Sequence, residues 1–313
     1  MFKSKPSLVI LAAGMASRYG GNKQIESFGP SNETIMEYSI YDSIKAGYGK
    51  VIFIIREEFS DSFKAAIEPK LKDKIEIEYV YQSLDKYSGD RAIPTERSKP
   101  FGTQHALLCC KEILDTPFSV INADDFYGFD AFKQSFDFLS KDIEDNKYAC
   151  IGYELKNTLS DHGSVTRGEI NVNDKGDITG ITERKEIHKK DGKAFTKIND
   201  TDLELPLNTK VSMNFFCFTP DFVNWSELEY HKFLDENLDN LKAEFLIPEV
   251  ADKLINSKKG TIKMIPTEAK WFGVTFKEDA PIVKAQLQKL SDESIYPRNL
   301  WEQEVLSAVI EGL

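Results

Sequence analysis

The residues best suited to chemistry follow a short apolar run near the start of the sequence. Leu8–Ala13 leads into Gly14, and two cations, Arg18 and Lys23, come shortly afterwards. Small residues let backbone N–H groups approach an anion, and paired cations favour a polyphosphate. The segment therefore predicts a phosphate-binding turn. A plain strand-end turn with solvated cations is the structural alternative.

The spacing in this turn excludes two common phosphate-binding motifs. A P-loop requires GxxxxGK[ST], but Gly20 is followed by Gly21 and Lys23 by Gln24. A dinucleotide fingerprint requires GxGxxG, and Ala16 stands where the second glycine would be. Neither ATPase-type nor dehydrogenase-type phosphate binding fits the sequence.

A second candidate group is a pair of carboxylates, Asp124 and Asp125, which follows the apolar Val120–Ile121. Carboxylates at the end of a buried parallel strand lie at the sheet edge where ligands of open α/β folds bind. Mg²⁺ bound to nucleotide phosphates takes one or two such oxygens together with water. We expect Asp124 to be the metal ligand and Asp125 the alternative. A turn or a helix cap would equally use an Asp-Asp pair.

Short Val- and Ile-rich runs alternate with segments of helical spacing through the first half of the chain, which is the βαβ pattern of a parallel, doubly wound sheet. The expected strands are Ser7–Ala13, Lys50–Ile55, Ile75–Gln82 and Phe118–Asn122. The expected helices are Thr34–Ala46, Phe59–Leu71 and Thr103–Ile113.

Beyond about residue 148 the strand candidates lack equal helices between them, so the sheet becomes mixed. These candidates are Ala149–Leu155, Glu169–Val172, Ile178–Thr182 and Val211–Phe218. The charged stretches Asn157–Gly168 and Arg184–Asn208 are interpreted as hairpin loops or a flap over a site. From Asp221 onward the chain is mainly helical, with strand candidates at Thr261–Ile265 and Trp271–Phe276.

Composition bounds the remaining possibilities. The 313 residues carry a net charge of −11, which disfavours nucleic acid as a partner. The four cysteines and four histidines have no metal-ligand spacing, so we expect buried thiols and structural or surface histidines. Leu8–Ala13 is too short for a membrane span or a signal-peptide core. We therefore expect a cytoplasmic protein without a membrane partner.

The glycine-rich turn resembles that of the sugar-1-phosphate nucleotidyltransferases (nucleoside diphosphate sugar pyrophosphorylases), whose signature is LAxGxGTR followed by a P-K or S-K pair. Ala16 replaces the usual second glycine. The matching residues are Leu11, Ala12, Ala13, Gly14, Ser17, Arg18, Lys23 and Gln24. The resemblance implies a Rossmann-like α/β fold with a mixed, mostly parallel sheet and a helical C-terminal extension. It also implies a catalytic domain over 1–276, divided into a nucleotide-binding half (1–147) and an acceptor half (148–276), with residues 277–313 as the extension.

Further motifs extend the resemblance. Gln82, followed by Pro100–Ala106 with Gly102 and Thr103, is similar to the family's Gln…GxxxA arrangement, which holds the nucleobase. An amide can donate and accept at once, as a base edge requires. The polar insert between them, Ser83–Pro100, is compatible with a mobile lid or with a plain surface loop.

The second half matches less closely. Ile181–Lys185 resembles the family's Glu-Lys-Pro segment, which implies that Glu183 contacts the sugar and that Lys185 or Arg184 contacts its phosphate. A charged hairpin end is the structural alternative. Asn214 is implied as a sugar contact, and Gly273 stands where family members carry a second metal carboxylate.

The resemblance implies a Mg²⁺-dependent transfer of a nucleotidyl group from a nucleoside triphosphate to a sugar 1-phosphate, with pyrophosphate released. UTP or dTTP are the expected nucleotides, and Arg18 and Lys23 the catalytic cations. Three alternatives remain open. They are a cytidylyltransferase acting on a phospho-alcohol such as phosphocholine, a nicotinamide-dependent dehydrogenase, and a non-catalytic nucleotide-binding protein.

Overall fold

A computed structural model describes residues 5–14, 26–160, 163–198, 201–274 and 279–302 of the chain. Its strands are β1 Ser7–Leu11, β2 Lys50–Ile55, β3 Glu76–Tyr81, β4 Phe118–Asn122, β5 Asp125–Phe126, β6 Lys147–Glu154, β7 Val165–Val172, β8 Ile178–Lys190, β9 Lys193–Ile198, β10 Thr201–Leu205, β11 Lys210–Phe218, β12 Thr261–Pro266 and β13 Phe272–Gly273. Its helices are α1 Ile35–Ala46, α2 Ser60–Leu71, α3 Thr103–Leu108, α4 Phe129–Lys141, α5 Pro220–Asn237, α6 Ile247–Asn256 and α7 Ala280–Asp292, with short 3₁₀ turns η2 Glu57–Phe59 and η3 Leu155–Asn157.

One large mixed sheet organises the molecule, in the order β10-β9-β8-β7-β11-β4-β1-β2-β3, with β6 paired to β11 and β12. Strands β4, β1, β2 and β3 are parallel, as the βαβ pattern predicts. Strand β11 runs antiparallel to β4, which is where the second half joins the first. The expected α/β fold with a mostly parallel core and a mixed second half is confirmed.

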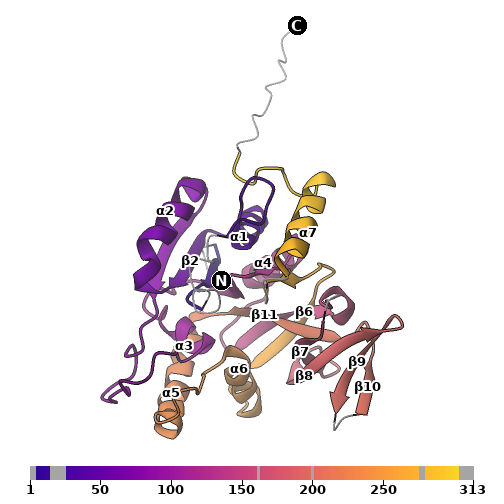
Figure 1. Ribbon diagram of the computed structural model, residues 1–313. Helices are drawn as coiled ribbons and strands as arrows, with labels where there is room; N and C mark the ends of the chain where they lie inside the picture. The colour runs from indigo at the N-terminus through magenta and orange to yellow at the C-terminus, as the bar shows by residue number, and fades with distance from the viewer. Residues whose placement is uncertain (1–4, 15–25, 161–162, 199–200, 275–278, 303–313) are drawn as a thin grey trace.

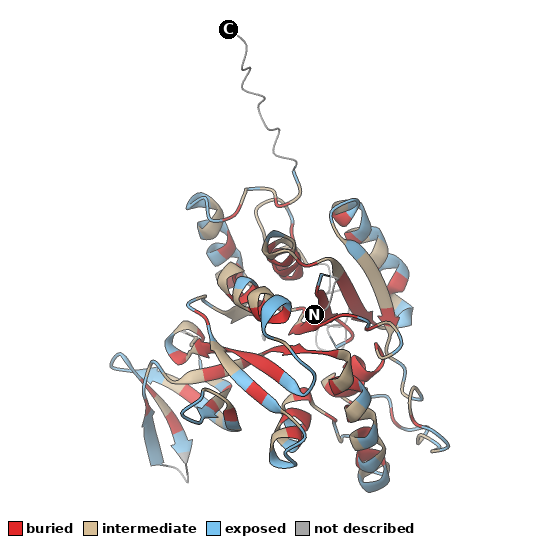
Figure 2. Cartoon of the chain, turned by 180° about the vertical axis from the view of Figure 1, so that it is seen from behind, coloured by how far each residue is buried: buried red, intermediate tan, exposed pale blue. Residues whose placement is uncertain are grey.

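Helices cover both faces of this sheet (Figure 1). One core cluster packs α3, α5 and α6 against the sheet, and a second packs α1, α2 and α4 against the other face. Figure 2 shows the buried residues gathered on the central strands and the inner helix faces. Because β1, β2 and β4 are covered on both sides, they tolerate continuous apolar runs rather than alternation.

Local signals explain why particular elements begin and end where they do. Helix α1 starts with a capping box in which the Thr34 backbone N–H donates to Glu37 and the Glu37 N–H donates back to the Thr34 hydroxyl. It ends at Gly47, whose φ of 116° lies in the left-handed region. These caps fix the direction in which the chain enters β2.

Two expectations for the elements were wrong in part. The stretch Arg184–Asn208, expected to be hairpin loops or a flap, is mostly strand, because it continues β8 and forms β9 and β10, which pair antiparallel. Helix α3 ends at Leu108 rather than Ile113, since the following N–H groups of Cys110 and Lys111 bond three residues back instead of four. In the part of the chain that the structure describes, no helix is long and apolar enough to cross a membrane.

Candidate functional site

The carboxyl ends of the parallel strands meet at one edge of the sheet. The Ala12 N–H, just past β1, donates to the Ile54 carbonyl of β2 at 2.9 Å. The Gln82 N–H, just past β3, donates to the Ile55 carbonyl at 3.1 Å. Strand β4 ends opposite the end of β1. This is the edge at which open α/β sheets bind ligands. Three of the predicted groups begin there: the glycine-rich turn after β1, Gln82 after β3 and the two carboxylates after β4.

The start of the glycine-rich turn lies at this edge. Leu11 is half-buried, Ala12 and Ala13 are buried, and Gly14 is exposed, so that among the described residues a Cβ at Gly14 would meet no atom within 4 Å. Arg18 and Lys23 lie outside the described residues. The described part of the turn therefore has the small side chains that an approaching phosphate requires, and the two cations stay a prediction.

The structure brings Gln82 into contact with the start of α3. Gln82 Nε2 donates to the Gly102 carbonyl at 3.3 Å and lies 3.3 Å from His105 Nδ1. Gly102 has a φ of 103° and a ψ of −175°, and a Cβ there would lie 2.7 Å from the Phe245 carbonyl oxygen. Only glycine suits that conformation and that space.

Thr103 lies where α3 meets α6. Its hydroxyl accepts a hydrogen bond from the Ile247 N–H at 3.1 Å, at the first residue of α6. The Thr103 side chain thus joins α3 to α6, while Gln82 and Gly102 form the pair that fits a base-binding role.

The polar insert Ser83–Pro100 is anchored to the body of the protein. Arg97 is only 3 % exposed, and its guanidinium stacks 3.6 Å from the Phe101 ring centre. Arg97 also donates to the Asn240 and Ala243 carbonyls, in the segment between α5 and α6, at 3.0 and 2.7 Å. This anchoring favours the interpretation of the insert as a fixed surface loop rather than a lid.

The two adjacent carboxylates have different surroundings. Asp124 is half-buried at the sheet edge, whereas Asp125 is 9 % exposed. Asn122 Nδ2 lies 2.9 Å and the Tyr127 hydroxyl 3.2 Å from Asp125 Oδ2. Burial, reinforced by the charge of Asp124, raises the pKa of Asp125 to about 7.

Gly273 lies directly opposite Asp125 in the small β5–β13 sheet. A Cβ at position 273 would lie 2.5 Å from Asp125 Oδ1. The Asp125 carboxyl thus fills the space into which a side chain at 273 would extend.

Asp124 fits a single-carboxylate magnesium site better than Asp125 does. Asp125 is enclosed by its hydrogen-bond donors and by Gly273, whereas Asp124 is the more accessible of the pair. Among the described residues, no group of three His, Cys, Asp or Glu side chains could hold a metal ion by itself. Such a site therefore suits a cation that arrives with phosphate oxygens, as Mg²⁺ does with nucleotides.

Glu183 and Lys185 lie exposed on β8 and form an ion pair of 3.2 Å with one another. Arg184 is committed elsewhere, since its Nε donates to Glu169 at 2.6 Å. The Glu183 charge also contributes, after burial, to the raised pKa of Glu249 in the first turn of α6. Of the two candidate cations, Lys185 is therefore the one able to reorient toward a ligand.

Asn214 occupies an irregular point of β11. Its φ is 60°, and the register of β11 with β6 shifts between Ser212 and Phe216. The preceding carbonyl, of Met213, lies 3.1 Å from the Tyr127 hydroxyl that also faces Asp125. The structure therefore links the Asn214 bulge to the carboxylates through one tyrosine.

Sequence reasoning missed two side chains near the site. Arg167 is 9 % exposed, its guanidinium lies 4.6 Å from the Trp271 ring centre, and its Nε donates to the Thr158 hydroxyl at 3.1 Å. Burial lowers the pKa of Arg167 to about 10, while the charge of Asp125 opposes that shift. His105, expected to be structural, contacts Gln82. An inward-facing cation within an alternating strand was the available signal for Arg167.

Comparison with known proteins places the chain among transferases. A family model described as nucleotidyl transferase matches residues 8–278. A search of curated proteins found no match.

Solved structures share the fold at low sequence identity, which by itself supports likeness of fold alone. The inositol-1-phosphate CTP transferase of T. maritima superposes with a TM-score of 0.61 at 13 % identity, covering 93 % of this chain and 98 % of that one. A Bacillus anthracis protein assigned as a glucose-1-phosphate thymidylyltransferase gives 0.58 at 14 %, covering 90 % and 95 %. A UDP-glucose pyrophosphorylase complexed with UDP-glucose gives 0.56 at 16 %, covering 91 % and 99 %.

Proposed function

We propose, because this chain belongs to the nucleotidyl transferase family, that it transfers a nucleotidyl group from UTP or dTTP to a sugar 1-phosphate and releases pyrophosphate. One observation carries the proposal. The Gln82–Gly102 pair, the small residues Ala12 and Ala13, and the half-buried Asp124 all lie where parallel strands end. A base, a polyphosphate and its counter-cation need such groups at one edge.

The reaction requires no protein base. A phosphate monoester, with a second pKa of about 6, is mostly dianionic near neutral pH and can attack directly. One of its oxygens bonds to the α-phosphorus as the bond to the bridging oxygen of the β-phosphate breaks, and pyrophosphate leaves with that electron pair. Positioning and neutralisation of charge then account for the catalysis.

Most of the predicted residues have a place in this scheme. Arg18 and Lys23 neutralise the triphosphate, and the amides of Leu11–Gly14 approach its oxygens. Asp124, with Asp125 as the alternative, would hold Mg²⁺, which when bound neutralises phosphate charge. Gln82 and Gly102 hold the base.

The acceptor half supplies the sugar contacts in this proposal. Glu183 and Asn214 accept from or donate to sugar hydroxyls, and Lys185 meets the sugar phosphate. The exposed Glu183–Lys185 pair supports this role because such a pair contributes little stability and is readily exchanged for a ligand.

A second candidate is a cytidylyltransferase that acts on a phospho-alcohol. The similarity to the T. maritima inositol-1-phosphate CTP transferase over 93 % of this chain favours it. The chemistry at the α-phosphorus would be the same, so only the base and the acceptor distinguish the two candidates.

A substrate panel with pyrophosphate detection tests the proposal. The five common nucleoside triphosphates would each be incubated with Mg²⁺ and with sugar 1-phosphates, inositol 1-phosphate or phosphocholine. We expect pyrophosphate only when UTP or dTTP is combined with a sugar 1-phosphate. Pyrophosphate from CTP and a phospho-alcohol would support the second candidate. Nucleotide binding without pyrophosphate from any pair would contradict catalysis altogether.

A further inference from the structure

His105 lies buried beneath the Gln82 side chain, and its ring is held in one orientation. The ring stacks on Tyr230 with centres 4.7 Å apart and planes 19° apart, and it meets the Phe101 ring edge-on at 5.7 Å. His105 is fully buried, so the ring cannot rotate without disturbing both aromatic neighbours. Its two nitrogens therefore face fixed partners.

Those partners determine which nitrogen carries the hydrogen. His105 Nε2 lies 3.0 Å from the Lys86 backbone carbonyl, and a carbonyl only accepts. Nε2 must therefore be the protonated nitrogen. Burial lowers the pKa of His105 to about 4, so the ring is neutral near pH 7 and Nδ1 carries a bare lone pair.

The same reasoning fixes the Gln82 amide. One terminal atom of this side chain lies 3.3 Å from His105 Nδ1 and 3.3 Å from the Gly102 carbonyl. Both partners accept, so the Gln82 atom facing them is the NH₂ group. The reverse amide with the other histidine tautomer would set lone pairs against the Gly102 and Lys86 carbonyls. Gln82 Oε1 consequently points away, and within the described ranges no hydrogen bond to it is found.

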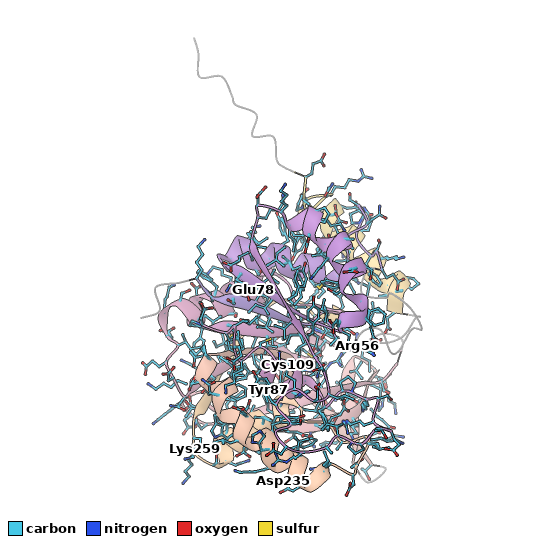
Figure 3. The ribbon with its side chains drawn as sticks, turned by 90° about the vertical axis from the view of Figure 1, so that its left-hand side faces the viewer. Arg56, Glu78, Tyr87, Cys109, Asp235 and Lys259 are labelled. Carbon is cyan, nitrogen blue, oxygen red and sulfur yellow. The ribbon has the colours of Figure 1, made fainter. Side chains whose placement is uncertain are left out.

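The polar insert holds this arrangement in place. Lys86, the insert residue whose carbonyl receives the His105 hydrogen, also donates through Nζ to the Cys109 carbonyl at 2.9 Å. Figure 3 labels the next insert residue, Tyr87, close to Cys109, which follows α3. The Lys86 carbonyl is thus tied to the helix that carries His105.

We propose that His105 is a positioning residue that locks the Gln82 amide with its NH₂ inward, so that only its carbonyl oxygen meets the nucleobase. This rests on the proposed function, in which Gln82 contacts the base. A pyrimidine placed with N3 against Gln82 must then offer an N–H at that atom. Uracil and thymine have an N3–H, whereas N3 of cytosine carries a lone pair that repels the Gln82 oxygen.

Substitution of His105 tests the proposal, because it should change the preference for UTP over CTP. His105→Phe keeps an aromatic ring against Tyr230 and removes both nitrogens, so that of the two acceptors only the Gly102 carbonyl still holds the amide. We expect the KM for UTP to rise about tenfold and CTP use to increase, with kcat for UTP nearly unchanged. N3-methyl-UTP lacks this N–H and should be a poor substrate for the wild type. The preference for UTP over N3-methyl-UTP should be smaller in the variant.

A matched control separates this effect from damage to the core. Gln104 is the fully buried neighbour of His105, but its Nε2 donates to Ser226 Oγ of α5 at 2.9 Å. Gln104→Met should leave the UTP-to-CTP ratio as it is in the wild type. A folded His105→Phe protein with the wild-type ratio, or a wild type that prefers CTP, would overturn the proposal.

A spectroscopic measurement tests, independently of turnover, which nitrogen of His105 carries the hydrogen. ¹⁵N chemical shifts of the histidines in the wild-type protein should show His105 protonated at Nε2 and bare at Nδ1. Gln82→Glu should raise the His105 pKa, because the new carboxylate would accept from a protonated Nδ1. A hydrogen on Nδ1 in the wild type would contradict the lock. If no substrate pair yields pyrophosphate, the proposed function fails, whereas these shifts and the thermal shifts produced by UDP and CDP still decide this inference.

Discussion

Asp124 and Asp125 are adjacent in the chain, yet their surroundings give them different properties. Asp125 is enclosed by Asn122, Tyr127 and Gly273, and burial raises its pKa to about 7. Asp124 is half-buried beside it. A carboxyl group that is already hydrogen-bonded and enclosed suits a cation that arrives with phosphate poorly, so we propose Asp124 as the metal ligand.

Asp124→Asn should lower Mg²⁺-dependent turnover by at least about 100-fold, because the charged ligand is replaced by a neutral one. The variant should still unfold in one cooperative transition, as a folded protein does. Pyrophosphate release and urea unfolding measure the two effects. Full activity in Asp124→Asn would transfer the role to Asp125 or to another group.

Gly273→Ala should destabilise the protein by about 1–3 kcal/mol, because its Cβ would lie 2.5 Å from Asp125 Oδ1 and 3.0 Å from the Trp271 ring. Gly180→Ala is the matched control, since a Cβ at this β8 position has open space. Chemical denaturation of both variants checks the difference. Equal stabilities would mean that Asp125 does not occupy the space beside Gly273.

Some of this site could be predicted from residue types alone. The Gln82–Gly102 pair and the acids that follow β4 are visible as motifs. His105 and Gly273 are different, because their roles depend on which strand or side chain lies opposite them. A sequence does not display the β5–β13 pairing or the tautomer that a distant carbonyl imposes.

At the scale of elements, the junction between β3 and α3 is the most constrained part of the site. Gly102 begins α3 in a conformation essentially restricted to glycine, and the Phe245 carbonyl packs against its Cα. Because Gln82 Nε2 donates to the Gly102 carbonyl, any shift of this turn moves the Gln82 amide, which we propose to contact the base.

Gly102→Ala should therefore cost about 2 kcal/mol or more in unfolding free energy and raise the KM for the nucleotide. Gly176→Ala isolates the backbone contribution, since Gly176 also has a positive φ, of 80°, but a Cβ there meets nothing. We expect the control to lose about 1 kcal/mol with an unchanged KM. A Gly102→Ala protein no less stable than Gly176→Ala would contradict the close approach of Phe245.

Elements with strong local signals were predictable to the residue. Strands β2 and β4 have the bounds that their apolar runs indicate, because both faces are covered. Strand β10 gave no such signal, since Thr201–Glu204 are exposed on both faces, and β9 alternates only over the few residues from Lys193 to Lys197. Exposure on both faces, as in β10, removes the alternation by which a strand is recognised, and a short strand such as β9 offers too few residues to show it.

At the scale of the whole molecule, the segment after α7 packs against α1 through buried polar contacts. The Tyr296 hydroxyl donates to Asp42 Oδ2 at 2.6 Å, and Trp301 Nε1 donates to Glu37 Oε1 at 2.6 Å. Asp42 is 1 % exposed, and burial raises its pKa to about 8. These contacts join residues separated by more than 250 positions in the chain.

The raised pKa of Asp42 makes stability depend on pH. Between about pH 3.8 and about pH 8 the folded protein holds a proton on Asp42 that the unfolded chain has released, so this group's contribution falls as pH rises. The slope is up to about 1.4 kcal/mol per pH unit within that window. Asp42→Asn should remove this pH dependence. The free energy of unfolding of the variant, relative to that of the wild type, should therefore increase toward pH 8. Parallel stability curves for the two proteins would refute a buried, protonated Asp42.

We propose above all that the turn after β1 holds a triphosphate against the carboxylates at the sheet edge. The most direct measurement is pyrophosphate release from the preferred nucleotide pair by Lys23→Ala, with Lys232→Ala, an exposed lysine of α5, as control. We expect kcat to fall at least about 100-fold in Lys23→Ala, with folding intact, and to be unchanged in Lys232→Ala. Unchanged turnover in a folded Lys23→Ala protein would contradict the account.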